Sequence, residues 1–187
     1  MNIAQQIVGV NERLGNFAVP DMQGTTRMIF DTFDITSLAT DQTTTFFSGV
    51  SAKVYPKTNL SQNRFEVGES LAIQGFSVFN YTSSNLTLAT VLNPQEQYRA
   101  GILNFYIGNQ RVCKDLEIIS YSRFNIGEAI SPDSEATIFR LETPIVIPPQ
   151  IEFYATLRWA ATTSLNGISQ VLTAFGTGTL LNTKQTF

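Results

Sequence analysis

The clearest pattern in the chain is an alternation of apolar and polar side chains between Ile151 and Trp159. Apolar residues occupy the odd positions, and the even positions carry Glu152, Tyr154, Thr156 and Arg158. Because successive side chains of a β-strand point to opposite faces, this segment is predicted to be a strand. We expect its odd positions to face the core and its even positions to face solvent or a partner.

Weaker versions of this pattern predict strands along most of the remaining chain. The predicted segments are Arg27–Ile35, Thr43–Phe47, Ser70–Thr82, Asn85–Leu92, Ile102–Ile107, Gln110–Val112, Leu116–Tyr121, Ala136–Leu141 and Gln170–Leu181. The pair Gly108-Asn109 predicts a tight two-residue turn between two of them. In the last segment, Gly176 and Gly178 are interpreted as marks of a bulged or edge strand.

A series of about eight to ten strands, joined by links of unequal length, predicts an all-β fold. The favoured architecture is a single jelly-roll-like antiparallel β-sandwich over residues 25–187. Residues 1–24 are predicted to form a short N-terminal arm, helical or extended. The arm has apolar residues at helical spacing, namely Ile3, Ile7, Val10 and Leu14. They form a face that would dock on a neighbouring copy, and the alternative is a frayed terminus.

The composition argues against the commonest catalytic chemistries. The 187 residues include no histidine and a single cysteine, Cys113. Serine and cysteine nucleophiles usually need a histidine base, and zinc usually needs histidine and cysteine ligands. We therefore expect no enzyme activity, no cofactor and no metal, and we interpret Cys113 as a small buried hydrophobic residue. A calcium site built from loop oxygens stays open as an alternative.

Paired carboxylates are another route to catalysis, because glycosidases need no histidine. The local pairs are Asp31 with Asp34 and Glu66 with Glu69. Asp31 and Asp34 are an odd number of residues apart, so on a regular strand they face opposite sides. Glu66 and Glu69 flank a glycine before a predicted strand, where charges commonly mark a solvated loop. Surface charge is therefore the favoured interpretation of both pairs.

The low charge of the chain bears on its partners. Charged residues make up 14% of the sequence, the net charge is −3, and the twelve Lys and Arg residues form no run. Nucleic-acid affinity rests largely on clustered basic charge, so direct binding to a genome is not expected. A surface with few charges is more readily covered by copies of itself or by other proteins. The sequence leaves contact with a membrane undecided.

Four tyrosines in or beside predicted loops are candidate contacts for a ligand or a partner. They are Tyr55, Tyr81, Tyr98 and Tyr121. Exposed aromatic rings can stack on a sugar or anchor a protein partner. Partial burial under long loops is the alternative interpretation.

Several segments resemble virion proteins of the viral jelly-roll class, especially capsid proteins of icosahedral bacteriophages. They are the run Thr143–Gln150, Thr-Pro-Ile-Val-Ile-Pro-Pro-Gln, which leads into the alternating strand, and the blocks Val67–Ile73 and Phe105–Asn109. The resemblance is diffuse: it extends over residues 25–181 as a general similarity of sequence pattern and includes no diagnostic motif. It implies a shell subunit that assembles into trimers, pentamers or pseudo-hexamers and carries no catalytic residues.

Together these observations lead us to expect a structural subunit of a virion. Its partners would be copies of itself and other virion proteins, with Tyr154 and Arg158 on a face that contacts a neighbour. Many RNA-virus jelly-roll proteins carry a basic arm, whereas the arm here has only Arg13, which favours a DNA phage. The main alternative is a receptor- or carbohydrate-binding module of a spike or fibre that uses loop tyrosines such as Tyr55 and Tyr81.

Overall fold

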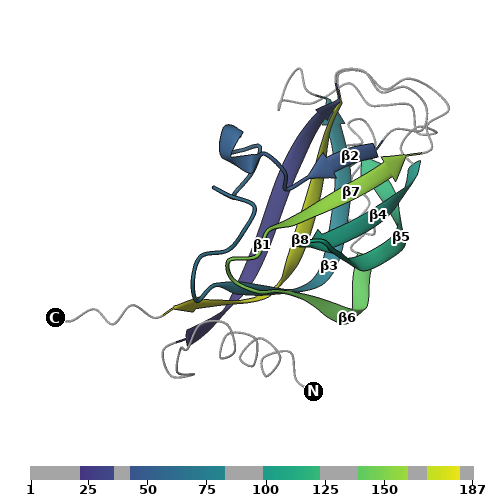
Figure 1. The fold of residues 1–187 in the computed structure, drawn as a ribbon. Coiled ribbons are helices and arrows are strands. Elements are labelled where there is room, and N and C mark those ends of the chain that lie inside the picture. The colour runs from purple at the N-terminus through teal and green to yellow at the C-terminus, as the bar shows by residue number, and fades with distance from the viewer. Residues whose placement is uncertain (1–21, 36–42, 83–98, 123–138, 160–167, 182–187) are drawn as a thin grey trace, which may run out of the picture.

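A computed structural model describes residues 22–35, 43–82, 99–122, 139–159 and 168–181 (Figure 1). Within these ranges the chain forms β-strands and one short 3-10 turn, Val50–Ala52, and no α-helix. The strands are β1 (Met22–Ile35), β2 (Thr43–Phe46), β3 (Ser70–Thr82), β4 (Arg99–Ile107), β5 (Gln110–Ser122), β6 (Phe139–Ile147), β7 (Phe153–Trp159) and β8 (Ile168–Leu181). The predicted arm lies almost wholly outside these ranges, and β1 begins three residues before the predicted domain start at residue 25.

The strands pair in a nested order. β1 pairs with β8, β2 with β7, β3 with β6 and β4 with β5, all antiparallel. Further pairing of β8 with β3 and of β7 with β4 completes two four-stranded sheets that pack against each other, β1-β8-β3-β6 and β2-β7-β4-β5 (Figure 1). A long hairpin of strand pairs wrapped into a sandwich in this way is a jelly roll. The predicted jelly-roll-like sandwich is therefore confirmed.

The two sheets also meet through backbone hydrogen bonding at one end. There β3 and β5 run parallel and pair at two positions, Phe79 with Tyr121 and Asn80 with Ser122. Counted through this pairing, the sheets form one continuous path from β1 to β2. The sandwich is thus joined at one end and held elsewhere by its core.

Phenylalanine rings fill the space between the sheets. The largest fully buried side chains are mostly phenylalanines, namely Phe46, Phe47, Phe65, Phe76, Phe105 and Phe153. The Phe153 ring centroid lies 5.2 Å from that of Phe65, 5.7 Å from that of Phe47 and 6.1 Å from that of Phe105. Facing sheets are about 10 Å apart, a gap that aromatic rings bridge in tilted and stacked pairs.

The predicted strand ends agree closely with the structure for some strands and differ for others. Ser70–Thr82 is β3, and the predicted turn at Gly108-Asn109 connects β4 to β5. The two predicted strands Gln110–Val112 and Leu116–Tyr121 are one strand, β5, interrupted by an irregularity near Asp115, which has a φ of 51°. The predicted strand Asn85–Leu92 lies outside the described residues.

Two further strand ends were predicted wrongly. The segment predicted to end at Leu141 continues through Pro144 to Ile147 as β6. Its residues from 141 to 144 depart from the pairing with β3, which resumes at Ile145. Proline, which has no backbone N–H to donate, is tolerated there because this stretch is not paired with β3. Ile151, predicted to face the core, precedes β7 and is 37% exposed.

The glycines of β8 have a different role from the one predicted. β8 lies between β1 and β3, so it is not an edge strand. The bulge is in β3, where Ile73 is opposite Gly176 and Gly75 is opposite Phe175, which leaves Gln74 as the extra residue. A Cβ atom on Gly176 would lie 1.8 Å from the carbonyl oxygen of Ala72. Gly176 is thus required by the close approach of the β3 backbone.

Gly176→Ala should destabilise the protein, because the added methyl group overlaps backbone that cannot move without breaking strand pairing. We expect a loss of about 1–3 kcal/mol or more in the free energy of unfolding, measured by urea denaturation. Gly24→Ala in β1 is the matched control, since a Cβ atom there has no heavy atom within 4 Å. Equal stability of the two variants would contradict this role of Gly176.

Candidate protein interface

The outer face of the sheet β2-β7-β4-β5 is defined by the alternation in β7. Phe153, Ala155 and Leu157 are fully buried in the core. Tyr154 and Arg158 therefore project from the opposite side, as the sequence predicted, and Arg158 is exposed. Their contact with a neighbouring subunit stays a prediction.

A pair of stacked tyrosines lies on this outer face. Tyr106 of β4 is directly opposite Tyr154 of β7, and their rings are nearly parallel with centroids 4.5 Å apart. Both side chains are half-buried. The sequence reasoning missed Tyr106, although it sits at an outward position of a recognised strand, because only the pairing register brings it against Tyr154.

The centre of the face is polar but uncharged, and charges lie on β5 beside it. Asn104 of β4 is opposite Thr156 of β7, which is opposite Thr45 of β2. The Asn104 side-chain oxygen accepts hydrogen bonds from the Asp115 backbone N–H at 2.9 Å and from Arg111 at 3.3 Å. This amide therefore fixes the irregular part of β5 against β4.

The predicted loop tyrosines fall in different places. Tyr55 lies in the connection between β2 and β3 and is 79% exposed. Tyr81 and Tyr121 belong to β3 and β5, near the end where these strands pair, and their side chains are outside the description. Tyr98 and the arm residues Ile3, Ile7, Val10 and Leu14 also lie outside the described residues. Sugar binding by the tyrosines stays a prediction.

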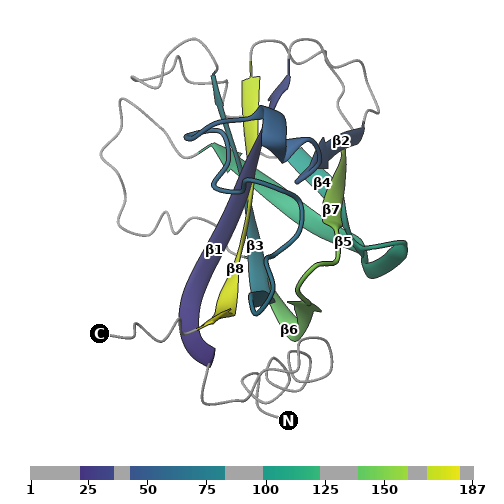
Figure 2. The same cartoon turned by 60° about the vertical axis from the view of Figure 1, so that its left-hand side comes forward.

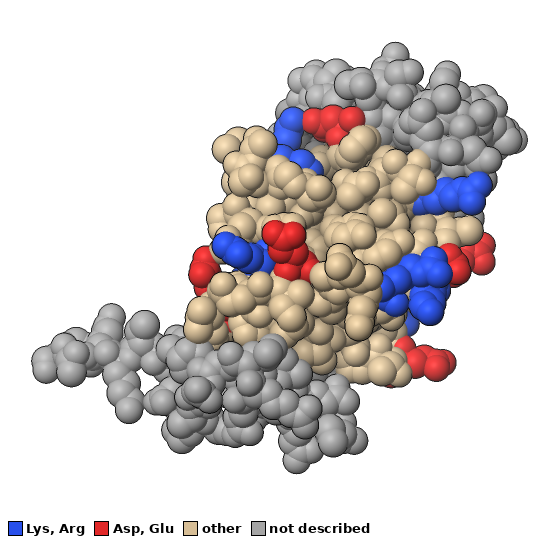
Figure 3. Space-filling view, in the orientation of Figure 1, with Lys and Arg blue, Asp and Glu red and all other residues tan. Residues whose placement is uncertain are grey.

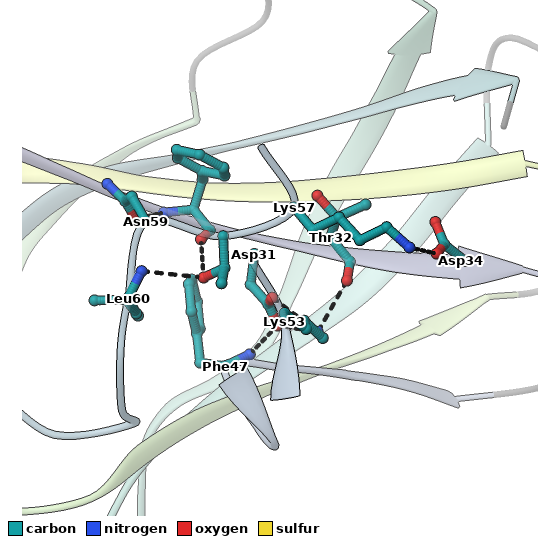
Figure 4. Close-up of polar contacts among 10 residues, drawn as sticks. Asp31, Thr32, Asp34, Phe47, Lys53, Lys57, Asn59 and Leu60 are labelled. Carbon is teal, nitrogen blue, oxygen red and sulfur yellow. Dashed lines mark hydrogen bonds and ion pairs between the residues drawn. The ribbon is translucent and has the colours of Figure 1, made fainter. Parts of the chain in front are cut away.

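A buried polar cluster attaches the connection between β2 and β3 to β1 (Figure 4). Asp31 is fully buried, and its carboxylate accepts a hydrogen bond of 2.7 Å from the Phe47 backbone N–H. Lys53 Nζ donates to both Asp31 oxygens at 2.8 Å and to the Thr32 carbonyl at 2.9 Å. A buried carboxylate needs such partners, because an unpaired charge in the interior is costly.

The same connection covers part of the outer edge of β1 (Figures 1 and 2). Asn59 Oδ1 accepts from the Phe30 backbone N–H at 2.9 Å, and Asn59 Nδ2 donates to the Met28 carbonyl at 2.7 Å. Thr58 Oγ1 donates to the Phe30 carbonyl at 2.9 Å. These side chains satisfy backbone groups that a neighbouring strand would otherwise bind.

The carboxylate pairs singled out in the sequence are held by cationic or amide groups. Asp31 is buried while Asp34 is exposed, in line with the prediction that they face opposite sides. The interpretation of Asp31 as a surface charge is wrong, because its side chain is fully buried. Asp34 accepts hydrogen bonds of 2.6 Å from Lys57 Nζ and from the Ser169 hydroxyl. The Lys57 hydrogen bond, followed by that of Ser169, lowers the pKa of Asp34 below its ordinary value. An acid that donates a proton near neutral pH needs a raised pKa, which Asp34 does not have.

The second pair lies at the entry to β3. Glu69 forms an ion pair of 2.9 Å with Arg27, whose guanidinium carbon lies 4.3 Å from the centroid of the Phe65 ring. Glu66 accepts a hydrogen bond from the side-chain amide of Gln62, and its backbone carbonyl accepts from the Glu69 N–H at 3.0 Å. These contacts organise a turn and close the rim of the core with a cation–π contact.

Other candidate chemistry is sparse in the described part of the chain. Burial, with a smaller effect of the Asp115 carboxylate, raises the pKa of the Cys113 thiol, which makes its reactive thiolate form scarcer. Cys113 is half-buried and packs against the core, so it is less buried than predicted. The described residues include no group of three or more Cys, Asp or Glu side chains arranged to hold a metal ion. Nor do they contain a helix long and apolar enough to cross a membrane.

Comparisons with known proteins identify no relative. No protein-family model matches the chain, and neither the curated proteins nor the solved structures contain a significant match.

Asp31→Asn should weaken the cluster at β1, because Lys53 loses its counter-charge and the Phe47 N–H loses a strong acceptor. We expect the free energy of unfolding to fall by about 1–3 kcal/mol. Asp115→Asn is the control, since the Asp115 side chain is 68% exposed and lies 3.7 Å from Arg111. That change should stay within about 0.5 kcal/mol. Equal losses in urea denaturation would contradict the special role of Asp31.

Lys57→Gln should raise the pKa of Asp34 toward its ordinary value of 3.8, because the largest cause of the lowered pKa is removed. A carboxyl group with a lowered pKa stabilises the folded state above the unfolded pKa, and the contribution is lost as the pH falls through the folded pKa. Carbon-13 NMR titration of the Asp34 carboxyl group measures the shift. Lys114→Gln, on the other sheet, should leave the titration unchanged, and an unchanged curve in the Lys57 variant would contradict the assignment.

Proposed function

We propose that the chain is a structural subunit of a virion, a capsid protein of an icosahedral DNA bacteriophage that self-assembles through its β-sandwich. The observation that carries the proposal is the nested pairing of β1 with β8, β2 with β7, β3 with β6 and β4 with β5. This jelly-roll order is used by viral capsid proteins and also by lectins and cupins. The choice among these classes rests on the surface, since a fold alone does not define a function.

The charge distribution favours a protein partner over a nucleic acid. Several basic side chains are paired with acids, as Arg27 is with Glu69, Lys53 with Asp31 and Lys57 with Asp34. A basic group that is already paired contributes less to the release of counter-ions that drives binding to phosphates. A subunit of this kind suits a shell whose genome is packaged by other proteins.

The exposed sheet face favours contact between copies. Figure 3 shows that most of the described surface on the side with β2 and β7 at the front is uncharged, with Lys, Arg, Asp and Glu in separate small groups, one of them near the middle of the view. Protein interfaces have this composition, with few charges at the centre and enrichment in tyrosine and arginine. Tyr106 and Tyr154 supply aromatic side chains near the middle of this face.

Light scattering of the purified full chain, with negative-stain electron microscopy of the same sample, tests the proposal. We expect defined oligomers such as trimers or pentamers, or closed shells, whose population rises with protein concentration. A monomer at every concentration would contradict a shell role. A monomer that binds a glycan and loses this binding in Tyr55→Ala would instead favour the carbohydrate-binding alternative.

A further inference from the structure

The pairing register arranges opposite charges symmetrically about β4 on the outer face. Ile102 of β4 is directly opposite Arg158 of β7 on one side and Glu117 of β5 on the other. All three positions are exposed, and Ile102 is an exposed apolar side chain with 41% of its surface accessible. Neighbouring strands are about 4.8 Å apart, so Arg158 and Glu117 lie at similar distances on either side of β4.

Arg158, Ile102 and Glu117 thus form a row across the three strands, and a second row on the same face has a related arrangement. Tyr106 of β4 is opposite Tyr154 of β7 on one side and Arg111 of β5 on the other. Leu103 and Phe105, at the alternate positions of β4, are fully buried, which places both rows on the outer side. In each row, therefore, a side chain of β7 has a chemically complementary side chain of β5 at the mirror position across β4.

This arrangement is self-complementary under a two-fold rotation. If a second copy is turned by 180° about an axis that runs along β4 in the plane of contact, each β7 position faces the β5 position of the same row. Arg158 then faces Glu117 of the second copy, and Tyr154 faces Arg111 of the second copy. An arginine can pair with a carboxylate or lie over a tyrosine ring, so both contacts are favourable. Ile102 and Tyr106 meet their own counterparts near the axis.

We propose that the outer face of β2-β7-β4-β5 packs against the same face of a second copy of this chain across such a two-fold axis. The inference rests on the proposed function, for which it names one contact between subunits. Closed symmetric oligomers commonly use isologous contacts in which residue i contacts residue j and j contacts i. The uncharged residues Asn104 and Thr156 lie between these two rows and would be covered in this dimer.

Charge reversal distinguishes this geometry from any other use of the face. In Arg158→Glu, two glutamates meet at each of the two equivalent contacts, and in Glu117→Arg two arginines meet there. We expect each single variant to raise the dissociation constant for association across this face about tenfold or more, because like charges oppose each other twice in one interface. Sedimentation equilibrium or light scattering over a concentration series measures the constant.

The decisive result is whether a second charge reversal restores association. The double variant Arg158→Glu/Glu117→Arg restores opposite charges at both contacts, so we expect it to associate within a few-fold of the unmodified protein. An equimolar mixture of the two single variants should also associate, as a heterodimer. In that heterodimer the introduced glutamate of one variant faces the introduced arginine of the other, and at the second contact the unmodified Arg158 faces the unmodified Glu117. Matched reversals on β6, Arg140→Glu and Glu142→Arg, should leave association unchanged.

The possible outcomes test the proposed interface and the proposed function separately. If the unmodified protein associates and Arg158→Glu associates equally well, this face is not the interface and the proposed function stands. If both single variants weaken association but neither the double variant nor the mixture restores it, the two-fold pairing is wrong. If the unmodified chain is monomeric at every concentration, the proposed function and this inference fail together. Thermal unfolding of each variant, expected to match that of the unmodified protein, shows that the changes act at the surface.

Discussion

The buried carboxylate of Asp31 is the constraint on which the arrangement around β1 depends. It accepts the backbone N–H of Phe47, a residue in the left-handed region with a φ of 61°, and binds the ammonium group of Lys53. A non-glycine residue adopts that backbone region at a cost, so the hydrogen bond helps to hold it. As a result the Phe47 ring enters the core beside Phe105 and Phe153, while the chain turns away to cover β1. One acidic side chain thus links the packing of the core to the path of the longest described connection.

The two faces of the sheet β2-β7-β4-β5 perform separate tasks. Its inner side contributes Phe46, Phe105 and Phe153 to the aromatic core. The outer side has tyrosines and threonines flanked by charges. Because the inner positions are committed to the core, changes on the outer face can alter association with little effect on the fold.

Local patterns predicted the strands well because alternation is a property of consecutive residues. The alternation in β7 and the Gly108-Asn109 turn were recognised from the sequence for this reason. The burial of Asp31 was not, since it depends on Lys53 and Phe47, which reach it only after the chain has folded. The stacking of Tyr106 on Tyr154 likewise depends on the register between β4 and β7. The requirement for glycine at position 176 arises from a bulge in another strand, β3. Contacts between distant segments decide these features, and no local pattern encodes them.

Asn59 has a consequence for the way in which copies can accumulate. Its side chain occupies the hydrogen-bonding groups of Met28 and Phe30 on the outer edge of β1, in place of a backbone strand. A strand from another molecule cannot then pair along the whole of β1 without displacing it. Runaway growth of the sheet into fibrils is hindered along that stretch.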